Sequence, residues 1–419
     1  MVLCLRLVNL VYLGKMKVSK SKNNRIWIYI VSVILILSAG IGVWIYVSAN
    51  SKPQTNNDKS TVTEKTTAPV DTKPAVPVIH MAAMGDMLAH DTIIANAKVG
   101  DSYDFSKYFV NILPIYKDAN AVFCNQEGLV SGEQYGISGY PSFNAPTKFA
   151  ADLQTGARCN VINLANNHMG DKGVAATNAT IDIWTQLKPL AISGANKSEA
   201  DQNKISYGVV EGIKIGFVAF ADFNNNNSTP GYSVNIYHNE SLVRSLVTTA
   251  RANADVVIVS MHWGVEDSSV VSADQLNQTN LLSSLGVDVI IGTGPHVLQK
   301  ADIINRSDSG KTLVWYSLGN MLSSQLNLKE LIGGVAQFDI TKTVDKKITI
   351  SNPTFTPTYM HYEWTATEAA NGNLLARKNA MIYPLADAAV PLSKSLLGTT
   401  VAEQKQYVID TLGPAVTVR

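Results

Sequence analysis

The chain has 419 residues, 46% of them hydrophobic, so it is long enough to bury a sizeable core in one large domain or in two or three average ones. Its 34 basic and 33 acidic residues nearly cancel. This balance creates no overall positive field that would attract a nucleic acid, so we expect no nucleic-acid partner.

The first element along the chain is an apolar segment, residues 26–47, that carries no charged side chain. It is long enough to cross a bilayer as one helix and exceeds the apolar core of a cleaved signal peptide, which is the alternative. Basic residues precede it: Lys15, Lys17, Lys20, Lys22 and Arg25. The positive-inside rule therefore predicts a cytoplasmic N-terminus (residues 1–25) and a single-pass protein of the cell membrane, with its main domain extracytoplasmic. Met1 and Met16 are both candidate start sites.

Residues 48–77 are rich in threonine, lysine, proline and asparagine and nearly lack large apolar side chains. Such a segment cannot bury enough apolar surface to offset the entropy of folding. We therefore expect a flexible linker, or stalk, here. The folded domain should then occupy residues 78–419.

From residue 78 onward, short apolar runs alternate with longer segments of helical periodicity. This pattern predicts an α/β fold with buried sheets. The strand candidates, each followed closely by a polar or small residue, are 78–84, 121–124, 160–165, 214–221, 255–261, 287–292 and 312–318.

Two helices have clear boundaries in the sequence. One begins at Ser272, which forms a capping box with Gln275, and ends before Gly286. Another begins near Thr400 with the same signal. Residues 366–395 are weakly patterned, and no element is predicted there.

The three cysteines show no CxxC spacing, which excludes a cysteine zinc site. Cys4 precedes the predicted anchor, whereas Cys124 and Cys159 lie in apolar runs that are typical of strands. We expect the latter two to be buried free thiols, because cysteine is often a small core residue. A disulfide between them is the alternative for an exported chain.

Side chains that can bind metals or transfer protons follow most of the predicted strands. They are Asp86 and His90 in GDMLAH, Asn125 and Glu127 in NQE, Asn166, Asn167 and His168 in NNH, His262 in HWG, and His296 in GPH. Because the loops after the strands of an α/β fold converge on one crevice, we expect these residues to meet. Imidazole, carboxylate and amide ligands suit Zn, Mn or Fe, and such a site activates water for attack on phosphorus or a carbonyl carbon.

Each motif taken alone also has a structural explanation. Asp86 is typical of a turn, Asn125 and Glu127 of a helix cap, and His262 and His296 of ordinary buried histidines. The NNH motif is the hardest to explain in this way, because two amides and an imidazole suit the end of a buried strand poorly. The structural explanations would have to hold independently at every motif.

In chain order, GDMLAH, FCNQEG, NLANNHMGDKG, ISGANKSEA, VSMHWGVE, DVIIGTGPHVLQ and WYSLGN resemble motifs of the CapA-type poly-gamma-glutamate capsule synthesis proteins, of the calcineurin-like metallophosphoesterase superfamily. The resemblance covers roughly residues 79–340. It implies a metallophosphoesterase-like core of two packed β-sheets flanked by helices, and two divalent metal ions (Mn, Fe or Zn). The implied metal-centre residues are Asp86, His90, Glu127, Asn167, His168, His262 and His296, of which His90, His168 and Asn167 are also catalytic. The implied supporting residues are Asn125, Asn166, Trp263, Gly319 and Asn320.

The chain departs from the family pattern at two places. Many members read NLE where this chain has Asn125, Gln126 and Glu127, and histidine often occupies one or both of the positions held here by Thr293 and Gly294. The GHxH motif of ordinary metallophosphoesterases is therefore only half present.

The resemblance and the polar residues together predict a membrane-anchored, extracytoplasmic, metal-dependent hydrolase of the phosphoesterase type, linked to capsule or poly-gamma-glutamate biosynthesis. Its expected partners are a phosphoester substrate or an anionic surface polymer, with a membrane synthase complex as a further candidate. The alternative is a non-catalytic assembly or export factor for such a polymer.

Overall fold

Alternating side chains along the central strands explain the layers of the molecule. In β8 (Ile213–Ala221), Phe217 and Ala219 face one apolar core, while Val218 and Phe220 face a second core on the other side of the strand. Because successive side chains of a strand point to opposite faces, a run that is apolar throughout needs cover on both sides. Strand β8 is accordingly buried between a second sheet and a layer of helices.

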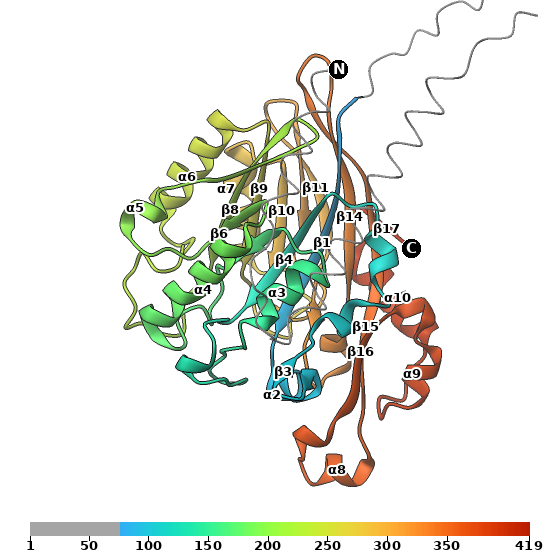
Figure 1. Cartoon of the computed structure of the whole chain (residues 1–419). Helices are drawn as coiled ribbons and strands as arrows, with labels where there is room; N and C mark the ends of the chain where they lie inside the picture. Colours follow the sequence, from blue (N-terminus) through green and yellow to red (C-terminus); the bar gives the residue numbers. More distant parts are fainter. Residues whose placement is uncertain (1–75) are drawn as a thin grey trace, which may run out of the picture. The chain divides into compact units, whose positions relative to one another are not determined.

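The computed structural model describes residues 76–419, which contain two large sheets and a small two-stranded sheet (Figure 1). Sheet 1 has nine strands. Seven of them are hydrogen-bonded in the order β16 (Lys378–Pro384), β15 (Ile348–Glu363), β14 (Ile332–Lys342), β1 (Val78–Leu88), β4 (Ala121–Glu127), β5 (Val161–Asn163) and β6 (Ala191–Ser193). The other two are β13 (Asn320–Leu322), which pairs with β1, and β17 (Thr417–Val418), which pairs with β15. In sheet 2, six-stranded, the order is β11 (Ala301–Asn305), β12 (Lys311–Trp315), β10 (Val289–Thr293), β9 (Val256–His262), β8 and β7 (Ser206–Val210). The small sheet pairs β2 (Lys98–Val99) with β3 (Ser102–Tyr103).

Helices fill the connections between the strands. The α-helices are α2 (Asp91–Ala97), α3 (Lys148–Thr155), α4 (Gly173–Leu187), α5 (Glu199–Gln202), α6 (Glu240–Asn253), α7 (Ala273–Ser284), α8 (Ala366–Ala370), α9 (Ala389–Ser393) and α10 (Val401–Leu412). Short 3-10 helices are η2 (Ser106–Phe109), η3 (Leu113–Tyr116), η4 (Glu133–Tyr135), η5 (Leu328–Leu331), η6 (Leu374–Ala376) and η7 (Leu385–Asp387).

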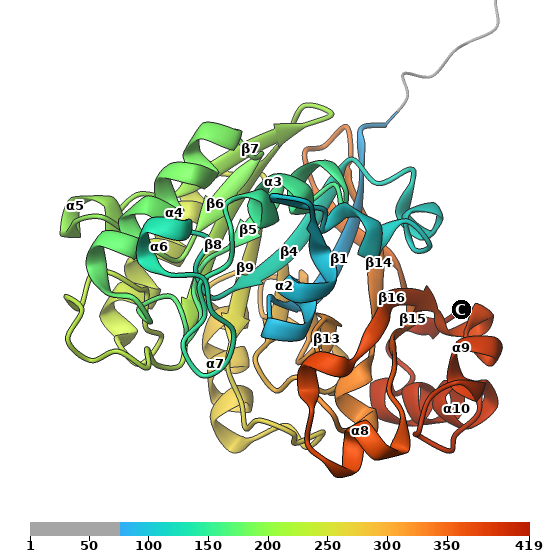
Figure 2. The ribbon, with the colours of Figure 1, turned by 60° about the horizontal axis from the view of Figure 1, so that its bottom comes forward.

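The two large sheets pack against each other through aromatic side chains. The ring of Phe123 in β4 lies 6.1 Å, centre to centre, from that of Phe217 in β8, and the rings of Trp315 and Phe355 are 5.8 Å apart. On the outer side of sheet 2, α6 and α7 contribute to the second core. On sheet 1, the indole of Trp184 in α4 donates a hydrogen bond to Gln126 in β4. Figure 2 shows α4 and α6 on the side of the molecule away from β14–β16.

All seven predicted strands are present, although several run further than the apolar pattern indicated. Strand β1 continues through Asp86, β4 through Glu127, and β9 through His262, so these residues lie within strand ends and not in the loops that follow. Both predicted helices are confirmed as α7 and α10, each with its capping box. The unassigned residues 366–395 contain β16 together with the short helices α8, η6, η7 and α9.

The expectation of two free thiols is wrong. Cys124 in β4 and Cys159, just before β5, form a disulfide with a Cα–Cα distance of 5.7 Å. The two strands are parallel neighbours in sheet 1, with Cys124 paired to Ile162, so the cysteines lie close enough to be bridged.

The predicted cytoplasmic segment, anchor and nearly all of the predicted linker lie in residues 1–75, outside the part that the structure describes. Within residues 76–419, no helix is both long and apolar enough to span a membrane.

Candidate metal centre

The ends of strands from both sheets bring the candidate residues together. Parallel pairing of β1 with β4 sets Asp86 opposite Asn125 and places Glu127 two residues further along the same edge. In sheet 2, His262 at the end of β9 pairs with Thr293 at the end of β10. Because both sheets contribute strand ends to this one region, residues far apart in the sequence become neighbours.

The centre of the cluster is formed by Asp86, Glu127 and His296, which are all buried. Each offers one possible ligand atom, and these atoms lie within 4.8 Å of one another. Oε1 of Glu127 is 3.7 Å from Nε2 of His262 and 3.8 Å from Nε2 of His296. Four side chains therefore surround a space of the size that a divalent ion requires.

The carboxylate of Glu127 has no hydrogen-bond partner for either oxygen among residues 76–419, although both oxygens are buried. Burial raises the pKa of Glu127 well above 4.5, with a further increase from Asp86 and an opposing effect of His296. Buried polar groups in folded proteins nearly always have partners. The two unpartnered oxygens fit the presence of a bound cation.

Asp86, in contrast, accepts several hydrogen bonds. Asn125 donates from Nδ2 to Oδ1 at 2.7 Å, and the backbone N–H of Gly294 lies 3.2 Å from Oδ2. Burial alone would raise the pKa of Asp86, but the hydrogen bond from His296 and the charge of His296 hold it below its ordinary value. Asp86 is therefore ionised and held in one orientation.

His296 adopts a backbone conformation that is rare for a residue with a side chain, at φ +61°. Such strain persists where the surrounding structure requires it, often at functional sites. Burial would lower the pKa of His296, but the carboxylates of Glu127 and Asp86 outweigh it and raise the pKa to about 10. The protonated imidazole of His296 therefore lies where the neighbouring carboxylates favour a positive charge.

His262 and Asn167 form the next part of the cluster. Nε2 of His262 lies 3.1 Å from the side-chain oxygen of Asn167, and Nδ1 lies 3.0 Å from Oγ1 of Thr293. Burial lowers the pKa of His262 to about 4, in spite of the opposing charge of Asp86. His262 is therefore neutral at neutral pH, as a metal-binding imidazole must be.

His168 and His90 lie beside this cluster, and both contact the ring of Phe143. The ring of Phe143 meets His168 edge to face at 4.7 Å and His90 at 5.1 Å. Nδ1 of His168 lies 2.8 Å from the carboxylate of Asp171, which also accepts the N–H of Phe143. Because a carboxylate only accepts hydrogen bonds, Nδ1 of His168 carries the proton and Nε2 is free.

At His90, loss of hydration is the largest effect on the pKa, followed by the positive charges of His296 and Arg377. Together they lower the pKa to about 3. The N–H of Ser324 is 3.4 Å from Nδ1. His90 is thus a neutral imidazole at the start of α2.

The supporting residues hold the strand ends. Asn166 accepts the N–H groups of Gly128 and His168 and donates to the carbonyl of Gln126, so it joins the NNH loop to the end of β4. Trp263 is a core residue whose indole donates to the carbonyl of Tyr316 at 2.8 Å.

Gly319 and Asn320 hold the end of β1 from the other side. The carbonyl of Gly319 accepts the N–H of Asp86 at 3.0 Å. A Cβ on Gly85 would lie 1.8 Å from that same carbonyl oxygen, so this position excludes any side chain. The side-chain oxygen of Asn320 lies 3.1 Å from Nδ1 of His296.

The structure explains why positions 293 and 294 depart from the family pattern. Gly294 lies at φ +107° and directs its N–H to Asp86, and a Cβ there would be 2.9 Å from the carbonyl oxygen of Trp263. The hydroxyl of Thr293 forms a hydrogen bond with Nδ1 of His262. A histidine at position 294 would therefore need a different local backbone.

Three residues near the cluster were not predicted from the sequence. Asp171 follows His168 at a spacing of three, a signal that a carboxylate could orient the imidazole. Asn163 donates to Asn125 at 2.9 Å and so extends the chain of hydrogen bonds from Asp86 into β5. Phe143 carries no sequence signal, because its place between the two histidines depends on the loop between β4 and α3.

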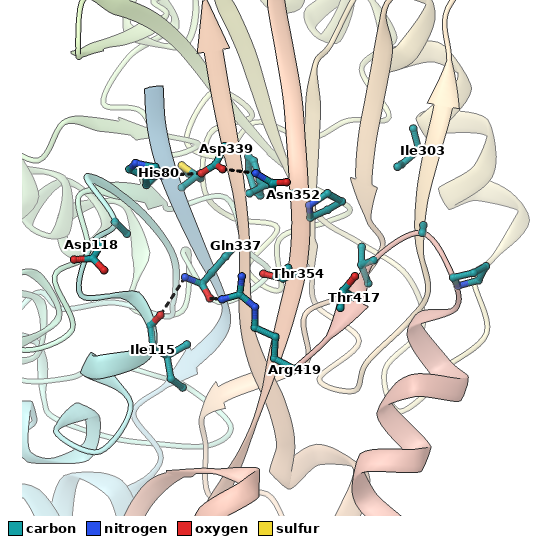
Figure 3. A pocket seen from close by; sticks show the side chains of 17 residues that line it. His80, Ile115, Asp118, Ile303, Gln337, Asp339, Asn352, Thr354, Thr417 and Arg419 are labelled. Atoms are coloured by element: carbon teal, nitrogen blue, oxygen red, sulfur yellow. Dashed lines mark hydrogen bonds and ion pairs between the residues drawn. The ribbon is translucent and has the colours of Figure 1, made fainter. Parts of the chain in front are cut away.

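A pocket of about 430 Å³ opens beside the cluster. Its lining includes Asn167, His262 and Gly294 of the cluster together with Phe223, Val265 and Glu266. A larger pocket, about 1130 Å³, lies near the beginning of β1 (Figure 3), away from the cluster. There the polar side chains pair with one another, as His80 does with Asp339 at 2.7 Å, and none of the candidate metal residues lines it.

The fold and the cluster define an α/β protein with a buried site of carboxylate, imidazole and amide groups suited to divalent cations. Residues 80–325 match the family model described as "Bacterial capsule synthesis protein PGA_cap". This match covers more than half of the chain, and the chain belongs to this family.

Two curated relatives are similar to the chain. The PGA biosynthesis protein CapA of Bacillus subtilis (strain 168) is 27% identical over 252 residues, which are 58% of this chain and 64% of that protein. The capsule biosynthesis protein CapA of Bacillus anthracis is 31% identical over 171 residues, which are 39% of this chain and 40% of that protein. The chain therefore covers less than two thirds of either relative.

Among solved structures, the NAD nucleotidase NadN of Haemophilus influenzae aligns with 71% of this chain and 61% of its own, at a TM-score of 0.42 and 12% identity. The 5'-nucleotidase of Candida albicans SC5314 aligns with 65% of this chain and 55% of its own, at a TM-score of 0.37 and 11% identity. Both TM-scores are below 0.5, so these likenesses are too weak to support a functional argument.

Proposed function

We propose that this chain is a metal-dependent hydrolase of the phosphoesterase type that acts in the biosynthesis of a bacterial capsule or of poly-gamma-glutamate. The observation that carries the proposal is the buried carboxylate of Glu127, which has no hydrogen-bond partner among residues 76–419 and lies between His262 and His296. A buried carboxylate without a hydrogen-bond donor is unfavourable, and the imidazoles of His262 and His296, at 3.7 and 3.8 Å from Oε1, lie beyond hydrogen-bond distance. A divalent ion bound there would give the two oxygens a partner.

The proposed ligands supply the mixed set of donors that Mn, Fe or Zn accept. They are Asp86, Glu127, His90, Asn167, His262 and His296, and we propose two ions. His168 is assigned to proton transfer, because Asp171 occupies its Nδ1 and only Nε2 is left. When bound, the ions would stabilise negative charge on a phosphoryl oxygen and make water more acidic.

In the proposed reaction, water adds to the phosphorus of a phosphomonoester, the P–O bond to the alcohol breaks, and a proton passes to the leaving oxygen. His168 is suited to hold that proton at Nε2, because Asp171 fixes the proton on Nδ1. His90 is suited to ligation and not to proton donation, since its pKa of about 3 keeps it neutral. Asn167 and His262 would orient the substrate from the side of the 430 Å³ pocket.

We further propose that the domain lies outside the cytoplasm, held by the predicted anchor at residues 26–47. The disulfide between Cys124 and Cys159 supports this location, because disulfides persist in oxidising compartments and are rare in the cytosol. An anionic surface polymer or phosphoester and a membrane synthase complex are the proposed partners there.

A second candidate is a non-catalytic assembly or export factor. It is favoured by Thr293 and Gly294, since neither directs a ligand atom to an ion where related chains often have histidine. Thr293 instead hydrogen-bonds His262, and Gly294 has no side chain. Under this alternative any metal would be structural.

The test is the elemental metal content of the full-length chain, purified without chelators, together with a screen of phosphoesters for hydrolysis. Glu127→Ala and His262→Ala are the informative variants, and His80→Ala is the matched control because His80 is a histidine in the same strand as Asp86 but far from the cluster. About two ions per chain are expected in the wild type and the control, with loss of both metal and hydrolysis in the other two variants.

Two results would contradict the proposal. A chain that binds no transition metal and hydrolyses no phosphoester supports the assembly factor. A chain that holds metal through Glu127 and His262 but hydrolyses nothing assigns the metal a structural role.

A further inference from the structure

The lining of the 430 Å³ pocket beside the candidate metal centre has two sources. Asn167, His262 and Gly294 belong to the metal cluster, so the pocket is continuous with it. The other lining residues come from the segment after β8 and from the turn after β9. A molecule bound at the centre would therefore extend into this pocket.

Two of these lining residues are large apolar side chains that remain exposed. Phe223 is 50% exposed and Val265 is 60% exposed. Trp263 also lines the pocket; it is buried, stacks on Tyr316 at 6.0 Å and is fixed by its indole hydrogen bond. Exposed apolar surface that lines a pocket beside polar groups is typical of a site for an apolar part of a ligand.

The charges of the pocket restrict that ligand further. Its charged lining residues within the described part of the chain are Asp222 and Glu266, and no lysine or arginine lines it. Asp222 is paired with His238 at 2.6 Å, whereas Glu266 is exposed and forms no ion pair in residues 76–419. A negatively charged group bound within a few ångströms of Glu266 would be repelled, because charges closer than the Debye length, about 8 Å at physiological salt, are only partly screened.

We propose that this pocket binds the organic group of a phosphomonoester, an aryl or alkyl group without negative charge, while the phosphoryl group occupies the proposed metal centre. The inference rests on the proposed hydrolase function and deepens it. Phe223 and Val265 contact the apolar group, and Glu266 selects against acidic ones. A poly-gamma-glutamate chain, which carries one carboxylate per residue, would bring negative charge close to Asp222 and Glu266, so we assign this pocket to an uncharged organic group and not to the polymer.

The test compares the binding of three non-hydrolysable probes to the metal-loaded, full-length chain by calorimetry: inorganic phosphate, methylphosphonate and phenylphosphonate. Burial of a phenyl ring predicts that phenylphosphonate binds about tenfold tighter than methylphosphonate. In Phe223→Ala and in Val265→Ala the ratio of these two affinities falls toward one. Val209→Ala is the matched control, since Val209 is a valine of β7 with 62% exposure that does not line the pocket.

Charge selection is tested with 4-carboxyphenylphosphonate. It should bind more weakly than phenylphosphonate, and Glu266→Gln should narrow the difference. Equal affinities for methylphosphonate and phenylphosphonate in the wild type would overturn the pocket assignment and leave the metal centre intact. Failure of all the probes, inorganic phosphate included, would overturn the hydrolase proposal itself, so the two failures are distinguishable.

Discussion

Nδ1 of His296 lies 3.1 Å from the carboxylate of Asp86, although 210 residues separate them in the chain. The side-chain oxygen of Asn320 lies at the same distance from Nδ1. Both partners present acceptors to this nitrogen, so Nδ1 carries a proton and Nε2 is the nitrogen available to a metal ion. Asp86 and Asn320 thus decide how His296 faces the candidate centre.

Loss of the amide at position 320 should weaken metal binding. In Asn320→Ala, one of the two acceptors that orient His296 is gone, and we expect the affinity for Zn or Mn to fall about 10- to 100-fold. Asn320→Asp keeps this acceptor but loses the hydrogen bonds that Nδ2 donates to Gln325 and to the carbonyl of Glu330, so it should restore only part of the affinity. Competition with a chromogenic chelator measures both variants, with Asn253→Ala in the exposed part of α6 as control. Equal affinity in Asn320→Ala and the wild type would show that His296 needs no such orientation.

Replacement of Glu127 by glutamine should stabilise the metal-free protein. The carboxylate is buried without a hydrogen-bond partner in the described residues, and a neutral amide of the same shape is cheaper to bury. We expect the free energy of unfolding, measured by denaturant in the presence of a chelator, to rise by about 1–3 kcal/mol. Added metal should stabilise the wild type but not the variant. A less stable metal-free variant would mean that Glu127 is held by its neighbours and not by an ion.

Asp171→Asn should reduce catalysis and leave metal binding intact. One oxygen of Asp171, Oδ2, accepts from Phe143 and from His168, so the amide oxygen of asparagine can replace it, but without its negative charge it no longer stabilises the charged form of His168. If the proposed hydrolysis is correct, kcat should fall about 10²- to 10⁴-fold while KM changes little. Asp118→Asn, in the distant pocket of Figure 3, is the control. An unchanged kcat would exclude the pair from proton transfer.

Removal of the disulfide should destabilise the fold. Cys124 and Cys159 are 35 residues apart, and the loop-entropy model then predicts a loss of about 3–4 kcal/mol in the double variant Cys124→Ala, Cys159→Ala. Reductant should lower the stability of the wild type by a similar amount and have no effect on the variant. If denaturant curves of the wild type coincide with and without reductant, the bond makes no contribution.

The sequence by itself determined the positions of the central strands and identified the candidate residues of the metal centre. Apolar runs of strand length were sufficient for the strands, because a strand covered on both faces must be apolar throughout. The capping boxes at Ser272 and Thr400 could also be predicted from the sequence, because each depends on two residues three positions apart. The order of the motifs from GDMLAH to YSLGN was sufficient to predict the family.

Only the tertiary structure decided how those residues meet. The pairing of Cys124 with Cys159 depends on β4 and β5 being neighbours, and the proton on Nδ1 of His296 depends on Asp86, more than two hundred residues away. Residues 366–395 lack a readable pattern because they form the edge strand β16 and helices too short to show a period. Helix caps and apolar strand patterns depend on residues a few positions apart and can be predicted from the sequence, whereas contacts between distant segments form only when the two sheets pack together.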